Sequence, residues 1–552
     1  MFFREKQSGG RKYLQIVENR WEDGGSRQRV IATLGRLDQL SESGAIDSLL
    51  RSGSRFAQAL MVISDHKKGK APAISTLRIG PGLVFERLWQ ELGLKEAIES
   101  LLFSRKFEFS VERAIFLTVL HRLFDPGSDR QAERWKDDYR IGGVEGLQLH
   151  QLYRAMAWLG EELPMDEQCS MTRFAPRTTK DLIEEQLFSR RRNLFSSLDL
   201  VFFDTTSIYF EGEGGDTVGA YGKSKDHRGD LKQMVVGAVL DHDGCPICCE
   251  LWPGNAADVK SLVPVVDRLR KRFQIGRVCI VCDRGMISAE TIRELEQRGW
   301  GYILGARMRR QKEVRDEVLS RGGRYQVVRP KGRRSKAPSP LQVKEVVVKG
   351  RRYVVCLNED QAKKDAADRE AIVAALADKL KQGDKSLVSN KGFRRYLKTG
   401  SDGFEIDEAK VSEEERFDGK WVLRTNQDFD AAEVALKYKE LWMVENVFRK
   451  VKSVLGTRPI FHKCDETIIG HVFCSFLALV LMKELNDRIE RKGGRLEWSD
   501  VIRDLDRLEE VEVEQDGKLF LLRSEAAGVC GKVLQAAGVA MPPTVRQLAS
   551  EA

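Results

Sequence analysis

Three acidic residues stand where their carboxylates could act together. Asp204 follows the apolar run VFF, Asp283 follows CIVC, and Glu445 lies within the stretch 436–455. Aspartate is disfavoured inside strands, so each aspartate is expected at the end of a strand. Mg²⁺ prefers carboxylate oxygens, and phosphoryl transfer with two metal ions requires several such oxygens around one point. The three acids together therefore indicate a two-metal site, whereas each acid alone is equally compatible with an ordinary turn or surface position.

The stretch 436–455, LKYKELWMVENVFRKVKSVL, is predicted to be one amphipathic helix. Tyr438 precedes Glu445 by seven residues, and Lys452 follows it by seven. Seven residues are close to two helical turns, so the three side chains are expected on nearly one line. An apolar flank beside that line is expected from Leu436, Met443, Val447, Val451 and Val454. The alternative is a surface helix with solvated charges.

The segments around the aspartates predict a mixed sheet. Three strands joined by short turns, LDLVFFDTTSIYFEG, LKQMVVGAVLD and PICCELWPGN, are expected to pair antiparallel. Helices then alternate with buried strands, in the order DVKSLVPVVDRLRKRF, GRVCIVCDRG, SAETIRELEQRG and WGYILGARM, which favours parallel pairing. The predicted fold class is α/β and multidomain, with an RNase H-like sheet of three antiparallel strands followed by parallel ones. A helical domain precedes this sheet, and a β-rich insertion interrupts it.

Changes of pattern along the chain predict six regions. They are a basic arm at 1–75 with a hairpin at 11–36 and a linker at 65–73, a helical domain at 76–195, the first part of the core at 196–312, the insertion at 313–411, the second part of the core with the Glu445 helix at 412–488, and a charged tail at 489–552. The arm is a candidate for DNA binding or simply a small hairpin module. The helical domain is a candidate for binding DNA ends, and the tail for dimerisation.

The insertion begins with a dense basic stretch. Between Arg307 and Arg352 there are 16 Lys or Arg residues against four acids, although the whole chain carries a net charge of only +9. Short β-like segments, RYQVVR, LQVKEVVVK and RRYVVCL, are interleaved with these charges. This combination favours a surface that follows phosphates, and the alternative is a solvated basic surface.

Cysteines and apolar runs indicate a cytosolic protein without a membrane role. Ten cysteines in 552 residues fit reduced thiols, and the cluster Cys245, Cys248 and Cys249 has no second pair at zinc-site spacing. The N-terminus MFFREKQSGGRK lacks the apolar core of a signal peptide. The longest apolar run, 472–482, is too short to cross a bilayer and predicts a buried helix.

Taken together, these motifs resemble the DDE transposases of bacterial insertion sequences, the group marked by a Y-x2-R-x3-E-x6-K signature and a β-rich insertion before the last acid. The matching segments are FFDTTSIYFEG, AYGKSKDHRGDLKQMVVG, DRGMIS, the Tyr438, Glu445 and Lys452 spacing, TRPIFH and GHVF, and they cover about 200–485. The arginine of the signature falls on Leu441, so that element is absent here.

The resemblance implies cut-and-paste DNA transposition. Asp204, Asp283 and Glu445 would hold two Mg²⁺ ions, for which Mn²⁺ can substitute, and Tyr438 and Lys452 would contact backbone phosphates near the cut. Further phosphate contacts are expected from Arg449 (as a replacement for the missing arginine), Arg458, His462, Lys223, Lys225 and Arg228.

The partners implied by the resemblance are double-stranded DNA, comprising the terminal inverted repeats of the element and the target DNA, and a second copy of the chain in a homodimeric synaptic complex. The location implied is cytoplasmic, in association with the bacterial nucleoid, with no membrane contact.

Some transposases of this kind stack a flipped base on a tryptophan of the insertion during hairpin formation. This chain has no tryptophan between Trp300 and Trp421. Either Tyr325, Tyr353 or Phe393 supplies the stacking, or the hairpin step is handled differently.

Two other functions stay open at this level. One is an RNase H-like nuclease that cuts without strand transfer, because the same metals serve both reactions. The other is a non-catalytic DNA-binding relative of a transposase.

Overall fold

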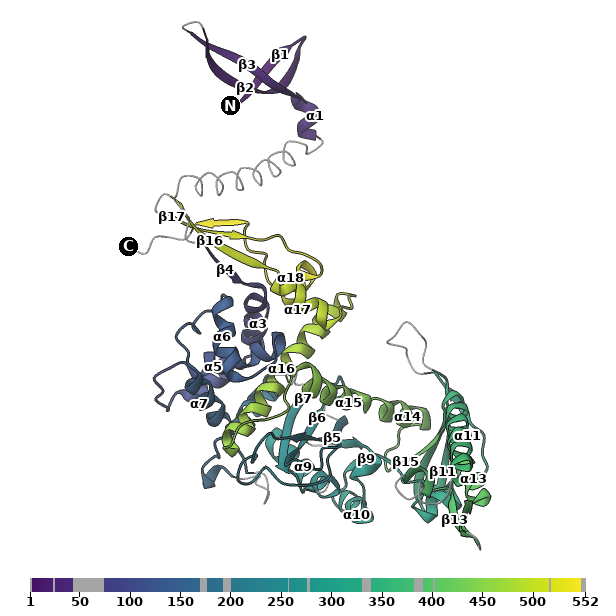
Figure 1. Cartoon of the computed structure of the whole chain (residues 1–552). Helices are drawn as coiled ribbons and strands as arrows, with labels where there is room; N and C mark the ends of the chain where they lie inside the picture. The colour runs from purple at the N-terminus through teal and green to yellow at the C-terminus, as the bar shows by residue number, and fades with distance from the viewer. Residues whose placement is uncertain are drawn as a thin grey trace. The chain divides into compact units, whose positions relative to one another are not determined.

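The computed structural model describes residues 2–22, 25–42, 74–168, 176–191, 200–256, 258–275, 278–329, 339–381, 391–400, 403–515 and 518–547. The predicted linker lies outside these residues. The chain forms two compact units (Figure 1). The first comprises Met1–Thr76, Glu510–Ser524 and Pro542–Ala552, and the second comprises Leu77–Glu509 and Glu525–Met541.

The first unit begins with a three-stranded antiparallel sheet of order β1-β2-β3, followed by a short helix. The bounds are β1 Phe2–Ser8, β2 Arg11–Glu22, β3 Gly25–Arg36 and α1 Leu37–Glu42. The antiparallel register of β2 and β3 confirms the predicted hairpin. The sequence pattern misses β1, because FFREKQS is almost fully exposed and shows no apolar alternation.

A second small sheet has the order β18-β17-β16-β4. Its strands are β4 Ile74–Arg78, β16 Glu509–Gln515, β17 Lys518–Arg523 and β18 Val545–Gln547. The β-like pieces of the C-terminal region are thus strands that share a sheet with a segment preceding the helical region. No local pattern reveals that pairing, because its partners are far apart in the sequence.

The second unit is built on a nine-stranded mixed sheet of order β10-β11-β12-β15-β9-β8-β5-β6-β7. Its core strands are β5 Leu200–Tyr209, β6 Gln233–Leu240, β7 Pro246–Pro253, β8 Cys279–Cys282 and β9 Gly301–Gly305. β5, β6 and β7 pair antiparallel, whereas β5, β8 and β9 pair parallel. The predicted sequence of three antiparallel strands followed by parallel ones is confirmed.

Alternation along β5 directs successive residues to opposite faces of the sheet. Phe202 belongs to the hydrophobic cluster on one face and Phe203 to the cluster on the other. The Phe203 face is covered by α9 (Asp258–Phe273) and α10 (Ala289–Gln297), and the Phe202 face by α14 (Ala431–Lys439), α15 (Trp442–Arg449) and α16 (Asp465–Arg491).

Part of the insertion extends this sheet, and β13 and β14 form a separate two-stranded antiparallel sheet. The strands β10, β11 and β12 pair in sequence and join the core through β15, which pairs antiparallel with both β12 and β9. The elements are a π-helical segment Glu313–Val318, β10 Gln326–Val328, β11 Leu341–Val348, β12 Arg351–Leu357, α11 Glu359–Lys381, α12 Lys391–Arg394, β13 Leu397–Gly400, β14 Gly403–Ile406, α13 Glu408–Glu415 and β15 Lys420–Thr425.

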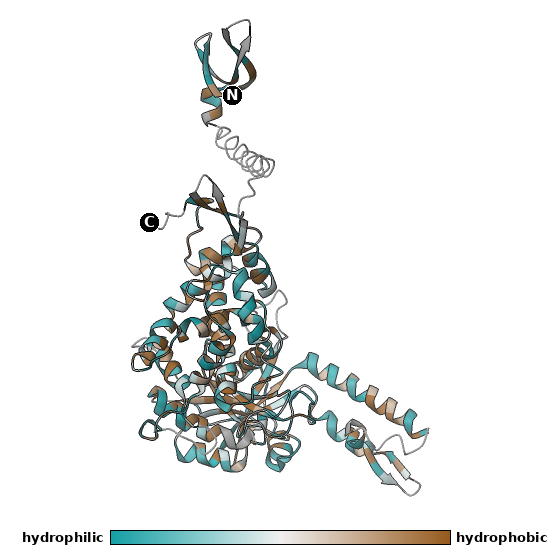
Figure 2. Ribbon diagram, turned by 60° about the vertical axis from the view of Figure 1, so that its left-hand side comes forward, coloured by the Kyte–Doolittle hydropathy of each residue, from teal (hydrophilic) through white to brown (hydrophobic). Residues whose placement is uncertain are grey.

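Of the helices that precede the sheet, α3, α5 and α7 contact α16, and α3 also contacts α17 and α18. Their bounds are α3 Gly80–Glu91, α4 Leu94–Leu102, α5 Val111–Phe124, α6 Asp129–Trp135, α7 Leu149–Gly160, α8 Thr179–Arg191, α17 Trp498–Asp506 and α18 Cys530–Ala537. One hydrophobic cluster runs from these helices to the Phe202 face of the sheet, and hydrophobic residues gather in this bundle in Figure 2.

Helix α16 is the buried helix predicted from the apolar run 472–482. By length and composition alone it could cross a membrane, but 83% of its most apolar window is buried inside the structure. It approaches α7 so closely at Gly470 that an added Cβ would overlap the carbonyl oxygen of Met156. These features make α16 the central helix of the bundle.

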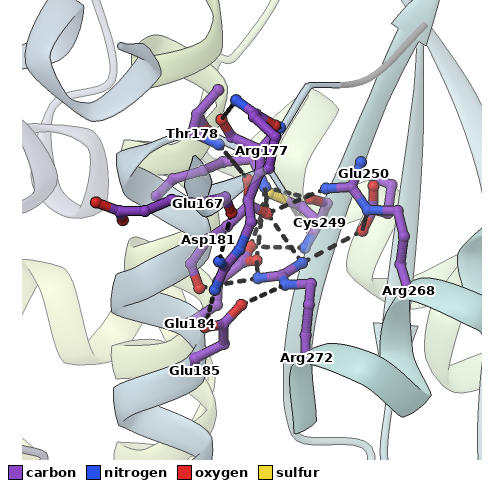
Figure 3. A network of polar contacts seen from close by, with 12 residues as sticks. Glu167, Arg177, Thr178, Asp181, Glu184, Glu185, Cys249, Glu250, Arg268 and Arg272 are labelled. Carbon is purple, nitrogen blue, oxygen red and sulfur yellow. Dashed lines mark hydrogen bonds and ion pairs between the residues drawn. The ribbon is translucent and has the colours of Figure 1, made fainter. Parts of the chain in front are cut away.

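A buried ionic network connects α8 with α9 and β7 (Figure 3). Arg272 on α9 contacts Asp181 at 2.9 Å and Glu184 at 2.6 Å, and Lys180 contacts Asp181 at 3.0 Å. Glu250 on β7 lies 3.3 Å from Arg272. Burial alone raises the pKa of Asp181, but the charges of Arg272 and Lys180 outweigh burial and lower that pKa below its ordinary value. The network thus holds the helical region against the sheet through buried contacts between opposite charges, although burial raises the pKa of Glu184.

Replacement of Arg272 by methionine should destabilise the second unit strongly, since Asp181 and Glu184 lose their main partner. Removing one member of a buried ion pair costs about 3–5 kcal/mol. The thermal unfolding midpoint, followed by calorimetry, should fall clearly. Arg298→Met is the matched control, because its contacts with Glu294 and Asp267 lie on the surface and are worth at most about 1 kcal/mol. Equal shifts in the two variants would contradict this account.

Candidate active site

Asp204 and Asp283 lie beside each other on neighbouring strands. The parallel register pairs Phe202 with Val281, and each aspartate follows its member of that pair by two positions. Both side chains therefore project from the Phe202 face of the sheet. Burial raises the pKa of the Cys282 thiol, and the charges of both aspartates raise it further, which agrees with their closeness.

The predicted strand-end position is confirmed for Asp283, which directly follows β8, and is wrong for Asp204. β5 continues to Tyr209 because its antiparallel pairing with β6 persists after the pairing with β8 has ended. Asp204 thus lies opposite Ala238 of β6, at the point where β5 and β8 part.

The predicted single helix 436–455 is divided. α14 ends at Lys439, α15 begins at Trp442, and a π-helical segment Lys450–Val454 follows. Between the helices, Leu441, Met443 and Val444 donate backbone hydrogen bonds to the third residue before them, which tightens the chain into a turn. Tyr438 and Glu445 therefore lie on different helices, and the expectation of one straight line of side chains is wrong.

Helix α15 positions Glu445 by burying its opposite side. Met443, Val444 and Phe448 are buried in the cluster on the Phe202 face, and α15 packs on β5 and β6. Glu445 itself is exposed and lines a pocket that Asp283 also lines. The structure thus brings together Asp204 and Asp283 through the sheet register, and Asp283 and Glu445 through this pocket.

Tyr438 donates a hydrogen bond from its hydroxyl to Asp283 Oδ1 over 3.0 Å. Burial raises the pKa of Tyr438, and the charge of Asp283 and this hydrogen bond raise it further, so the phenol stays protonated and remains a donor. The contact requires a glycine on β9, because a Cβ at Gly305 would overlap the Tyr438 hydroxyl. Tyr438 thus orients a carboxylate in this structure, whereas its predicted contact with a DNA phosphate remains a prediction.

The pocket contains basic and aromatic residues that the sequence analysis did not select. Arg284, Arg309 and Lys439 line it, as does Trp442, whose side chain is 44% exposed. Arg284 directly follows Asp283 and was detectable by that position alone, but the others reach the pocket only through the fold. Leu441, where the signature expects arginine, is buried at the edge of the same pocket.

Four of the predicted phosphate-binding residues gather in a second place, next to β5. Lys452 and Arg458 both contact Asp226, at 2.8 and 2.6 Å. Lys225 contacts the carbonyl and hydroxyl oxygens of Thr205, the neighbour of Asp204. Arg228 lies over the ring of Tyr209, as Arg458 also does.

The other predicted phosphate-binding residues lie elsewhere. Lys223 is exposed on the segment between β5 and β6. Arg449 is exposed at the end of α15, where it donates to Asn446 over 3.3 Å.

His462 is 13% exposed and lies 3.2 Å from Asp129 and 3.1 Å from His471. The ligand atoms of these three residues lie within 4.8 Å of one another, a spacing that could hold a metal ion. However, Arg122 lies 2.9 Å from His471 Nδ1, and burial, together with the charge of Arg122, lowers the pKa of His471. A neutral ring that accepts from a guanidinium indicates a hydrogen-bonded cluster, and we assign no metal to it.

Of the three aromatic candidates in the insertion, Tyr353 and Phe393 are buried. Tyr353 donates to Glu313 over 2.8 Å, and Lys379 lies over the ring of Phe393. Tyr325 is half-buried, with Lys344 above its ring. The ring best exposed to the pocket is instead that of Trp442, on the helix of Glu445.

A family model described as "Transposase DDE domain" matches residues 196–481. The chain belongs to the DDE transposases. A second model, described as "IS1634 family transposase, N-terminal domain", matches residues 3–65, so the recognised group of insertion-sequence transposases is confirmed.

A search of curated proteins finds no match to this transposase. Among solved structures it is similar to a piggyBac transposase synaptic complex with hairpin DNA (TM-score 0.37, 11% identity, 77% of this chain and 79% of that chain). It is also similar to a Mos1 transposase paired-end complex with the left transposon end (TM-score 0.15, 14% identity, 36% and 60%) and to a Mos1 mariner paired-end complex with Mn (TM-score 0.15, 14% identity, 40% and 76%). At TM-scores this low, none of the three establishes a shared arrangement of the chain.

The Gly305–Tyr438 contact of the transposase can be tested with a double-mutant cycle. Gly305→Ala should cost about 1–3 kcal/mol, because the new methyl group overlaps the phenol oxygen. Tyr438→Phe should remove most of that cost in the double variant, since the overlapping atom is gone. Thermal unfolding of the four proteins supplies the measurement.

Gly285→Ala is the matched control, because no atom lies within 4 Å of a Cβ added at that position. Additive effects of Gly305→Ala and Tyr438→Phe would contradict the proposed contact.

Proposed function

We propose that this protein is an insertion-sequence transposase that cuts the ends of its element and joins the freed 3′-OH ends to target DNA by two-metal phosphoryl transfer. The observation that carries the proposal is the placement of Asp204 on β5 and of Asp283 directly after β8, the parallel neighbour of β5, with Glu445 lining the same pocket as Asp283. A sheet of three antiparallel strands followed by parallel ones supports an RNase H-like core as part of this proposal.

The three carboxylates fit a divalent metal site. They are hard oxygen donors that a strand, a strand end and a helix supply on the same face of the sheet. Asp204, Asp283 and Glu445 would hold two Mg²⁺ ions, with Mn²⁺ as a substitute. Bound there, the ions would lower the pKa of the attacking hydroxyl and stabilise charge on the leaving oxygen.

The residues of the chain have separate tasks in this proposal. Tyr438 fixes one oxygen of Asp283, which orients the carboxylate for the metal. Arg284, together with Arg309 of the pocket, offers charged donors to backbone phosphates. Trp442 presents a ring on which an unstacked base near the cut can stack, a role that the buried Tyr353 and Phe393 cannot fill in their present positions.

The partners in this proposal are double-stranded DNA, as terminal inverted repeats and as target, and a second copy of the chain in the synaptic complex. The basic arm, the helical region, the insertion and the C-terminal region supply DNA or subunit contacts outside the carboxylate site. The enzyme would act in the cytoplasm, on the nucleoid. Imperfect inverted repeats in the DNA that flanks the coding region would support the element ends as substrate.

Asp204→Asn, Asp283→Asn and Glu445→Gln should each abolish Mg²⁺-dependent cleavage of a DNA fragment that contains the flanks of the coding region. Loss of several kcal/mol of transition-state stabilisation corresponds to a decrease of about a thousand-fold. Binding of the same DNA without metal should persist, as measured by fluorescence anisotropy.

Asp267→Asn, on α9 at the opposite face of the sheet, makes the same charge change and should cleave normally. Normal cleavage by any of the three site variants would remove that residue from the site. Absence of cleavage by the wild-type protein, with DNA binding intact, would favour the non-catalytic alternative.

Joining is tested separately from cutting. The wild-type protein is incubated with Mg²⁺, a supercoiled plasmid and pre-cut element ends that carry a free 3′-OH. It should yield joined products, which gel electrophoresis detects. Ends that terminate in a 3′-dideoxynucleotide should yield none, because the attacking hydroxyl is missing. Cleavage of uncut ends without any joining would instead establish the nuclease alternative.

A further inference from the structure

Asp226 connects two of the predicted phosphate-binding cations in an uncommon way. Its Oδ1 lies 2.8 Å from Lys452 Nζ and 2.6 Å from Arg458 Nη1, and its side chain is 10% exposed. Its Oδ2 is buried and has no hydrogen-bond partner among the residues that the structure describes. One carboxylate oxygen thus serves two cations while the other oxygen remains unsatisfied, which is unfavourable for a purely structural ion pair.

The surroundings of Asp226 hold its segment along β5, at the residues that follow Asp204. The Lys225 backbone donates to Ser207 of β5 over 2.8 Å, and the Lys225 ammonium contacts Thr205. Arg458 arrives from the other side, because Ile460 bridges to the end of β5. The cations therefore gather beside the part of β5 that directly follows Asp204.

The groups that face Asp226 would suit a phosphodiester better than a carboxylate. Lys452 and Arg458 carry two positive charges against the single charge of Asp226. Lys225 lies on the same segment, whereas the charge of Arg228 there is balanced by Asp230 at 2.9 Å. A phosphate carries its negative charge on two non-bridging oxygens, and each can accept from a separate cation. Burial lowers the pKa of Lys452 despite its contact with Asp226, so that contact compensates burial only in part.

We propose that Asp226 occupies, in the DNA-free transposase, a subsite for one backbone phosphate next to the cut, formed by Lys452 and Arg458, and that DNA displaces it. The inference rests on the proposed function, to which it adds that the Asp226 carboxylate competes with a DNA phosphate for Lys452 and Arg458. Displacement exchanges one anion for another at the two cations, so the net charge of the subsite is kept while the DNA strand is held beside Asp204. The carboxylate thereby weakens contacts with DNA that cannot insert a phosphate at this position.

The test is the affinity of Asp226→Asn for a fluorescein-labelled DNA duplex, measured by anisotropy without divalent metal over a range of salt concentrations. Without its competitor the subsite should bind about ten-fold more tightly at low salt, since charge-assisted hydrogen bonds to phosphate no longer replace an existing pair. The plot of log affinity against log salt concentration should be steeper for the variant than for the wild type. In the wild type the displaced Asp226 carboxylate takes up cations from solution when DNA binds, and the variant has no such carboxylate. Asp267→Asn makes the same charge change on the far face and should give less than about a two-fold increase.

Affinity of Asp226→Asn equal to or weaker than that of Asp267→Asn would overturn the proposal and make Asp226 a positioning residue for the two cations. The double variant Asp226→Asn with Arg458→Gln also removes one of the two cations that Asp226 would otherwise balance. It is the test to use if Asp226→Asn alone unfolds at a lower temperature than the wild type. It should bind less tightly than Asp226→Asn and no more tightly than the wild type, and tighter binding would also overturn the proposal. Failure of the wild-type protein to bind the duplex at all would count against the proposed function instead.

Discussion

The parallel pairing of β5 with β8 ends after Phe202 and Val281, and the candidate site is arranged around that point. Strands bonded in register carry residues of the same face side by side, so the next outward positions bring two aspartates together. Two neighbouring carboxylates repel each other unless donors or cations compensate them. Tyr438 donates one hydrogen bond to Asp283. The negative charge that this bond leaves uncompensated makes the position suitable for divalent metal ions.

The rest of the second unit maintains this arrangement from two sides. Apolar residues of α15 fix the helix on the Phe202 face, which keeps the backbone of Glu445 beside the pocket. At the β7 edge of the sheet, the network around Arg272 holds α8 against α9 and β7 (Figure 3). Buried ion pairs thus connect the helical region with the sheet. One hydrophobic cluster contains residues of both the helices and the sheet, so we expect the two to unfold together.

The sequence predicts much of the core because its signals there are local. Buried runs and short turns predict the pairing of β5 to β9, and Asp283 is recognisable because it interrupts an apolar run. The turn at Leu441 was not predictable from periodicity, since the apolar spacing continues through it. The contacts of Tyr438 with Asp283 and of Asp226 with Lys452 join residues more than one hundred positions apart, and no spacing rule reports such tertiary partners.

Strand β15 returns from the insertion directly alongside β9, with Leu423 opposite Gly305, the glycine against which the Tyr438 hydroxyl lies. Neighbouring strands cannot slide past each other without breaking their ladder of hydrogen bonds. A force applied to β11 or β12 is therefore passed across β15 and β9 to the phenol that holds Asp283. The strands β11 and β12 of the insertion are therefore joined by continuous strand pairing to the glycine that makes room for the Tyr438 hydroxyl.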